Sequence, residues 1–215
     1  MSLIILNAAL KFPDPSLADD EGLIAVGGDL SPARLLLAYR MGIFPWYAEN
    51  EPILWWSPDP RFILYPSELK VSKSMRTVIN SGAFKFTVNR SFPEVIRKCK
   101  DAIRYGEKGS WINDDIVEAY TQLHKDGYAH SAETWHEGKL TGGLYGLRIG
   151  NFFFGESMFS DRSNASKFAF IRYVDMLGKE GVTLIDCQMH TPHLASLGAR
   201  MISRKEFLDK LSPIL

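Results

Sequence analysis

Two apolar segments carry acid and amide side chains that could do chemistry: residues 184–188 (LIDCQ) and residues 152–160 (FFFGESMFS). Both segments are rich in β-branched or aromatic residues, which predicts buried strands. A buried polar group costs free energy unless it is hydrogen-bonded, so such a group needs a partner or a purpose. The segments therefore predict either a polar reaction centre in an apolar cavity or a hydrogen-bonded pair in the core. Spacing alone leaves both interpretations open.

Three side chains of these segments are the candidate catalytic groups: Asp186, Gln188 and Glu156. Because side chains alternate along a strand, we expect Asp186 and Gln188 on one face and Cys187 on the other. That face would hold an acid beside an amide, and we expect Glu156 to belong to the same site. Cys187 is interpreted as a packing residue.

The composition is that of an ordinary globular protein. The chain has 215 residues, of which 46% are hydrophobic and 23% charged, enough to bury a large core. It has no run of eighteen apolar residues, and its start lacks the basic and long apolar stretches of a secretory signal. The two cysteines, Cys99 and Cys187, are typical of a reducing compartment, and no His/Cys spacing indicates a metal site. These features predict a cytoplasmic protein without a membrane span or a bound metal.

Charge is unevenly spread along the chain, although the formal net charge is zero. Residues 1–60 contain three Lys/Arg against eight Asp/Glu, a balance of −5. Residues 61–110 contain eleven Lys/Arg against four acids, a balance of +7. Such a basic block is typical of a phosphate-facing surface, and also of ordinary solvated helices.

Caps, turns and apolar spacing predict a definite order of elements. Ser31 followed by proline starts a helix that Gly42 ends, and a stretch rich in tryptophan and proline follows over 42–61. The other expected elements are helices that begin after Ser72, Ser91 (as a capping box with Glu94), Asn113 and Ser203, a helix over 165–180, a short helix near His193, and strands over 84–89, 130–135, 139–148, 151–158 and around Asp186.

Three successive strands followed by helix, strand and helix predict an α+β fold, a mixed sheet with helices on its faces. This arrangement is similar to the core of the GNAT acyltransferases.

Several long peptides, taken together and in this order, are far more specific than any one of them. They are GGDLSPAR (27–34), GIFPW (42–46), WWSPDPR (55–61), WI (111–112), GESMFS (155–160), NASK (164–167) and LIDCQ (184–188). In combination they resemble the bacterial leucyl/phenylalanyl-tRNA–protein transferase family over nearly the whole chain. The resemblance implies a smaller N-terminal α/β domain, expected over residues 1–62, and a GNAT-like catalytic domain over residues 63–215.

The resemblance implies an aminoacyltransferase that moves Leu or Phe, with Met as an open third donor, from aminoacyl-tRNA to the N-terminal Arg or Lys of a protein. The product carries a destabilising N-terminal residue, an N-degron that directs proteolysis. The implied partners are Leu-tRNA or Phe-tRNA and the acceptor protein. No cofactor and no ATP are implied, because the aminoacyl ester is already activated.

The resemblance also assigns binding residues. Trp46 and Trp111 match the tryptophans that stack on the terminal adenosine of the tRNA, a contact worth roughly 1–3 kcal/mol per base. Trp55, Trp56 and Trp135 are expected in the core. The apolar donor pocket is expected to be formed by Leu144, Phe153, Gly155, Phe170, Tyr173 and Leu177. Contacts to the tRNA acceptor stem are expected among Lys70, Lys73, Arg76, Arg97, Lys98 and Lys100.

Aminolysis of an ester needs a neutral amine, a stabilised oxyanion and a route for one proton. A free α-amino group titrates near ~8, so about a tenth is neutral at pH 7 and a strong base is unnecessary. The resemblance places Gln188 at the reacting groups and Asp186 as its electrostatic partner or as the proton acceptor. A ribose hydroxyl of the tRNA is the alternative acceptor. Glu156 would contact the positive side chain or amine of the acceptor.

Three other functions are less consistent with the sequence. An acetyl-CoA-dependent N-acetyltransferase would need an [RQ]-x-x-G-x-[GA] pyrophosphate loop, which the chain lacks. A non-catalytic RNA-binding protein would leave the acid and amide groups unexplained. A serine hydrolase is disfavoured because no G-x-S-x-G is present.

Overall fold

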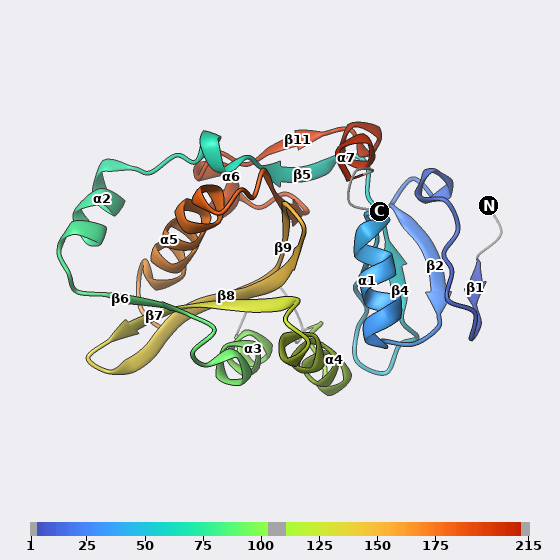
Figure 1. Ribbon diagram of the computed structural model, residues 1–215, viewed down its shortest axis with the longest axis horizontal. Coiled ribbons are helices and arrows are strands. Elements are labelled where there is room, and N and C mark those ends of the chain that lie inside the picture. Colours follow the sequence, from blue (N-terminus) through green and yellow to red (C-terminus); the bar gives the residue numbers. More distant parts are fainter. Residues whose placement is uncertain (1–3, 103–110, 212–215) are drawn as a thin grey trace.

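The computed structural model describes residues 4–102 and 111–211, and within them the chain forms two sheets (Figure 1). The larger sheet has seven strands in the order β11-β5-β10-β9-β8-β7-β6, and the smaller has four in the order β1-β2-β4-β3. The strands of the larger sheet are β5 (Arg61–Leu64), β6 (Lys85–Val88), β7 (Ala129–His136), β8 (Lys139–Ile149), β9 (Phe152–Ser160), β10 (Leu184–Gln188) and β11 (Arg200–Ile202). Those of the smaller sheet are β1 (Ile5–Leu6), β2 (Leu23–Gly27), β3 (Phe44–Pro45) and β4 (Leu54–Trp56).

Helices cover both faces of the larger sheet, with α5 on one side and α3 and α4 on the other (Figure 1). Neighbouring residues of β8 point into two different cores: Leu144 packs with Phe168 of α5, whereas Tyr145 packs with Ile96 of α3. The helices are α1 (Pro32–Arg40), α2 (Lys73–Asn80), α3 (Phe92–Asp101), α4 (Asp114–Lys125), α5 (Ala165–Lys179), α6 (Pro192–Ser196) and α7 (Arg204–Leu211), with 3-10 turns at Pro15–Leu17 and Pro66–Glu68.

The predicted α+β class is confirmed, and so is the meander. Strands β7, β8 and β9 pair antiparallel in succession, and β10 returns after α5 to pair parallel to β9. Strand β5 was not foreseen in this sheet, where it pairs antiparallel to both β10 and β11. The boundary expected after residue 62 lies inside β5, and the division into 1–62 and 63–215 stays a prediction.

Most predicted helix starts carry the expected cap. The side chains of Ser31, Ser72 and Asn113 each accept a hydrogen bond from a backbone N–H of the first helical turn. The capping box expected at Ser91 is wrong. The Ser91 hydroxyl donates to the Glu94 carboxylate, and the Ser91 backbone N–H donates to the buried carboxylate of Glu133. Glu133 therefore takes the capping role at the start of α3 that was expected of Glu94.

The smaller sheet packs around Trp55, which is fully buried as expected. Trp56 and Trp135 are partly buried and pack against the edge of this core. Each also donates its indole N–H: Trp56 to the Trp46 carbonyl at 2.6 Å, and Trp135 to the Thr87 hydroxyl at 2.7 Å. Among the described residues, no helix combines the length and apolar character needed to cross a membrane.

Candidate active site

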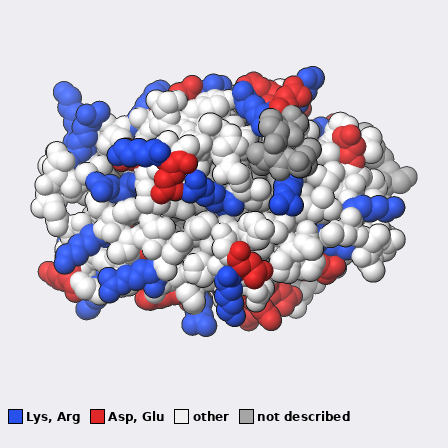
Figure 2. Space-filling view, viewed as in Figure 1, with Lys and Arg blue, Asp and Glu red and all other residues white. Residues whose placement is uncertain are grey.

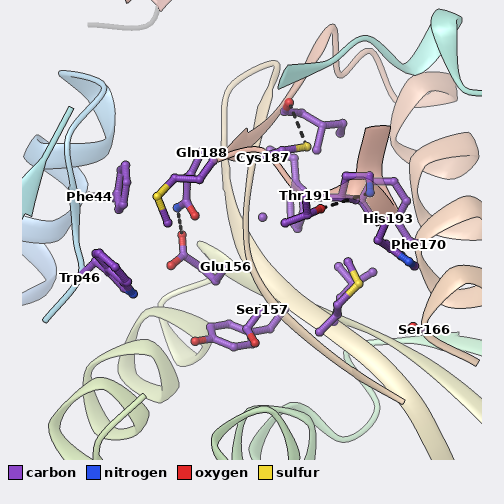
Figure 3. A pocket seen from close by; sticks show the side chains of 18 of the residues that line it. Phe44, Trp46, Glu156, Ser157, Ser166, Phe170, Cys187, Gln188, Thr191 and His193 are labelled. Atoms are coloured by element: carbon purple, nitrogen blue, oxygen red, sulfur yellow. Dashed lines mark hydrogen bonds between the residues drawn. The ribbon is translucent and has the colours of Figure 1, made fainter. Parts of the chain in front are cut away.

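A cavity of about 470 Å³ opens where β9 and β10 separate. These strands pair only from Phe152 to Phe154 and from Leu184 to Asp186, and the residues just beyond line the cavity. Phe44 and Trp46 lie on one side of it and Phe170 and His193 on the other, with the Glu156 and Gln188 side chains between them (Figure 3).

Two bulges lie next to each other at the point where the strands separate. In β9, Glu156 is an extra residue, because Tyr145 pairs with Ser157 while Gly146 pairs with Gly155. The bulge brings the β9 backbone so close that a Cβ on Gly146 would lie 2.1 Å from the Phe154 carbonyl oxygen. Only glycine fits at position 146, and the bulge re-aims Glu156 toward the cavity.

The second bulge lies in β10, where Cys187 is the extra residue: Asp186 pairs with Ile63 of β5 and Gln188 with Phe62. Because Ile63 and Phe62 are adjacent, their side chains point to opposite faces. Asp186 and Gln188 therefore do not share a face, and that prediction is wrong. The alternation rule assumes an uninterrupted strand, whereas one inserted residue reverses the facing of everything after it.

Glu156 is the centre of a hydrogen-bonded network of four side chains from four elements. Its Oε1 accepts from the Tyr39 hydroxyl at 2.7 Å and from the Gln188 amide nitrogen at 3.1 Å. Its Oε2 accepts from the Tyr120 hydroxyl at 3.2 Å. The two tyrosine hydroxyls are also within hydrogen-bond distance of each other, so their two protons are shared among three contacts. The expectation that Glu156 joins Gln188 is confirmed by this contact, drawn as a dashed line in Figure 3.

Burial raises the pKa of Glu156 to about 7, partly opposed by the hydrogen bonds from Tyr39 and Tyr120, with the nearby Asp186 charge raising it further. Burial also raises the pKa of both tyrosines well above the usual value, so both keep their protons. A carboxyl group with a pKa near neutrality can exchange a proton with an amine at physiological pH.

Asp186 lies behind the cavity wall and is fully buried. Both of its oxygens accept from the Arg61 guanidinium, at 2.9 Å and 2.6 Å. The cavity wall that was expected to present this acid instead presents Cys187 beside Gln188. Burial raises the pKa of the Cys187 thiol, so it is protonated and has the apolar packing role expected of it.

The apolar end of the cavity contains most of the predicted donor pocket. Leu144, Phe153, Gly155 and Phe170 line it. Tyr173 and Leu177 do not, and both are buried in α5 behind that wall. Their contact with the cavity is indirect, since the Tyr173 ring packs edge-on against the Phe153 ring at 5.1 Å between centroids. The two predicted stacking residues, Trp46 and Trp111, both line the cavity, and Trp46 is 37% exposed.

Several residues that line or support the site were not singled out from the sequence, among them Tyr39, Tyr120, Arg61 and His193. The two tyrosines and Arg61 lie in segments whose sequence is typical of ordinary core or loop. Their partners, Glu156 and Asp186, are more than thirty positions away, so no local spacing indicates these contacts. His193 lines the cavity, and its Nε2 atom is buried without a hydrogen-bond partner among the described residues. Its pKa is lowered by burial, so the imidazole is neutral at pH 7.

The basic block of residues 61–110 does not form one surface. Lys70, Lys73 and Arg76 lie on or before α2, which packs on α5, whereas the other three cations lie on α3 at the opposite face of the sheet. The face shown in Figure 2 mixes Lys and Arg with Asp and Glu. The cations on α3 are Arg97, Lys98 and Lys100.

Of the six cations, Lys98 on α3 borders a hollow next to the cavity. This hollow has a volume of about 580 Å³ and shares Met158 and Ser166 with the cavity. Lys98 is paired with Asp161 at 2.7 Å and Lys100 with Asp114 at 2.6 Å. In the part of the chain that the structure describes, no cluster of His, Cys, Asp and Glu could hold a metal ion.

Comparison with known proteins gives matches over most of the chain. The family model described as Leucyl/phenylalanyl-tRNA protein transferase matches residues 63–212, and the model of its N-terminal domain matches residues 28–59. Proteins named leucyl/phenylalanyl-tRNA–protein transferase include one from Syntrophobacter fumaroxidans, 54% identical over 99% of this chain and 91% of its own length. Another, from Flavobacterium johnsoniae, is 54% identical over 94% of this chain and 95% of its own length.

Solved structures with a similar arrangement are more distant. A GCN5-related N-acetyltransferase from Kribbella flavida matches with a TM-score of 0.42 and 11% identity, over 80% of this chain and 61% of its own. The L-PGS structure from Bacillus licheniformis matches with a TM-score of 0.42 and 16% identity, over 74% of this chain and 52% of its own. The family models and the close relatives establish that this chain belongs to the leucyl/phenylalanyl-tRNA–protein transferase family.

Proposed function

We propose that this enzyme transfers Leu or Phe from aminoacyl-tRNA to the N-terminal Arg or Lys of an acceptor protein, in the cytoplasm, and so creates an N-degron. The observation that carries this proposal is the pairing of Glu156 with Gln188 in the wall of a cavity whose other end is apolar. A single cavity thus offers an apolar space for the donor side chain and polar groups for the reacting amine and ester.

The donor would lie across this cavity. Its side chain fits among Leu144, Phe153 and Phe170, which together give aliphatic and aromatic contacts but no charge. Its terminal adenosine stacks between Trp46 and Trp111, at roughly 1–3 kcal/mol per base–aromatic contact. The aminoacyl ester joins these two parts and is thereby directed toward the Glu156 and Gln188 side chains.

The reaction forms one C–N bond and breaks one C–O bond. The neutral amine of the acceptor attacks the ester carbonyl, the ribose oxygen of the tRNA leaves, and one proton passes from the amine to that oxygen. The Gln188 amide donates to Glu156, which leaves its second N–H for the carbonyl oxygen of the substrate. Glu156, with a pKa near 7, accepts the amine proton or attracts the cationic acceptor. A ribose hydroxyl stays the alternative proton carrier.

The acceptor stem of the tRNA would lie over α3. Arg97, Lys98 and Lys100 belong to this helix, and Lys98 borders the hollow that adjoins the cavity. The ion pairs with Asp161 and Asp114 are exposed enough to exchange for phosphate, because surface ion pairs contribute little free energy. Lys70, Lys73 and Arg76, on the other face of the sheet, are weaker candidates.

A transfer assay with charged tRNA tests the proposal. Labelled Leu-tRNA or Phe-tRNA is mixed with peptides that differ only in an N-terminal Arg, Lys or Ala, and the N-terminally extended product is measured. We expect product with Arg and Lys, little with Ala, and a loss of about 10²-fold in kcat for Gln188→Ala. Transfer from acetyl-CoA without transfer from charged tRNA, or binding of tRNA without any product, would overturn it.

A further inference from the structure

The Arg61 guanidinium is held beneath the cavity wall through its Nε and Nη2 atoms, while its Nη1 is buried without a hydrogen-bond partner among the described residues. Its Nε donates to Asp186 Oδ1 at 2.9 Å and its Nη2 to Oδ2 at 2.6 Å, and both side chains are at most 1% exposed. The guanidinium carbon also lies over the rings of Phe44 and Phe207, 4.8 Å and 4.7 Å from their centroids. Two parallel hydrogen bonds to one carboxylate fix the plane of the guanidinium, and the two ring contacts support it.

Asp186 in turn holds the backbone that carries Gln188. Its Oδ1 accepts the Gln188 backbone N–H at 2.9 Å, directly after the bulge at Cys187. Gln188 has φ +61°, a left-handed conformation that is unfavourable for a residue with a Cβ. The hydrogen bond to Asp186 is what stabilises it, and from this conformation the Gln188 amide reaches Glu156 at 3.1 Å.

We infer that Arg61 is a positioning residue for transfer: it holds Asp186, and Asp186 holds the left-handed turn that places the Gln188 amide in the cavity. The inference rests on the proposed function. Asp186 is then not the proton acceptor. Both of its oxygens are taken by Arg61 and the Gln188 N–H, and it does not line the cavity that the amine would enter.

The same guanidinium links the two walls of the cavity. Phe44, whose ring the guanidinium carbon lies over, lines the cavity two residues before Trp46, while Asp186 lies two residues before Gln188. Loss of Arg61 would therefore loosen the amide that meets the ester and the segment that carries the stacking tryptophan. A bidentate fork is required, so a lysine at this position would not replace it.

The decisive experiment is a double-mutant cycle on kcat in the charged-tRNA assay. We expect Gln188→Ala and Arg61→Met each to lower kcat about 10²-fold, and the combined variant to be no worse than the poorer single variant, since both changes remove the same placed amide. Multiplied losses would mean that Arg61 acts independently of Gln188 and would overturn the inference. The first measurement is transfer by the wild-type enzyme. If the wild type gave no transfer, that result would refute the proposed function and not the inference about Arg61.

Because Arg61→Met leaves a buried carboxylate without its partner, that variant can fail to fold. The pair Arg61→Met with Asp186→Leu removes both charges and fills the space with apolar atoms, a replacement that buried ion pairs often tolerate. We expect this variant to fold, to keep its KM for aminoacyl-tRNA within about threefold, and to lose kcat as Gln188→Ala does. Wild-type kcat in a folded variant would overturn the inference. The exposed pair Arg200–Glu68, with both residues changed to Gln, is the matched control.

Conservative changes at Asp186 separate positioning from proton transfer. Asp186→Asn keeps an oxygen that can accept the Gln188 N–H, whereas Asp186→Ala does not. We expect the Asn variant to recover at least tenfold in kcat over the Ala variant and to keep the acidic limb of its pH–rate profile. The midpoint of that limb should move down, because the Asp186 charge that raises the pKa of Glu156 is removed. If Asp186 took the proton, the two variants would be equally inactive and the acidic limb of the profile would disappear.

Discussion

Removal of the Tyr39 hydroxyl tests whether Glu156 works as an ionised group. This hydroxyl donates to Glu156 at 2.7 Å and lowers the pKa of a carboxyl group that burial has raised to about 7. The change Tyr39→Phe removes that donor, while the ring keeps its contact with Phe154 at 5.1 Å between centroids. The ionised form of Glu156 loses a partner that the protonated form needs much less, so its pKa must rise.

The size of this rise follows from the remaining partners. A hydrogen bond to a charged group contributes about 1.5–3 kcal/mol. Because Tyr120 and Gln188 still donate to Glu156, we take the low end, which is a shift of about one pKa unit at 1.36 kcal/mol per unit. At pH 7 the ionised fraction would then fall from about one half to about one tenth, a loss of about fivefold in rate that raising the pH restores.

The assay is the initial rate of transfer from Leu-tRNA to an Arg-peptide between pH 6 and 9, corrected for spontaneous ester hydrolysis. The amine of the peptide titrates near 7.7–8.0 and contributes equally to every variant. The difference in midpoint between variants therefore belongs to the enzyme. Tyr65→Phe is the control, because Tyr65 packs under Arg200 and does not contact Glu156. A midpoint for Tyr39→Phe that stays in place or moves down would refute the role of ionised Glu156.

Three further outcomes are expected. First, the free energy of unfolding of the wild type should fall relative to that of Glu156→Gln as pH rises from 4.5 to 7, by up to roughly 3 kcal/mol, because a carboxyl group with a raised pKa resists ionisation in the folded state. Thermal unfolding at pH 4.5 and 8 measures the stability difference between the two proteins. The same difference at both pH values would contradict the expectation. Second, Leu144→Phe should raise the Leu:Phe donor ratio about tenfold, since it fills a buried wall of the pocket; an unchanged ratio places Leu144 outside the donor site. Third, Arg97→Glu should raise the KM for aminoacyl-tRNA and reduce the slope of its log–log salt dependence by about 0.9 or more. Arg76→Glu should give a smaller rise in KM and a smaller reduction of the slope. Equal effects of the two variants would mean that α3 is not the favoured surface for the tRNA.

Local features of the sequence determined much of the architecture. The caps at Ser31, Ser72 and Asn113 depend on contacts within a few residues, so local spacing reports them. The meander is reported by the short turns that join successive strands, although its pairs reach from Ala129 to Leu147 and from Gly142 to Ser160. The motif set identified the family for the same reason: each motif is a contiguous peptide. Leu144 and Phe153, assigned to the donor pocket on the basis of that resemblance, line the cavity, and their role in binding the donor stays a prediction.

Only the tertiary structure decided which polar groups meet. Asp186 pairs with Arg61, 125 positions away, and Glu156 with Tyr39, 117 positions away. The one-residue insertions at Glu156 and Cys187 are visible only when a strand is aligned with its partner, and each changes the side on which the following side chains point. The strand pairing that selects these partners depends on the whole sheet, since one inserted residue in β10 turns the Gln188 amide to the cavity while Asp186, before the insertion, stays in the core.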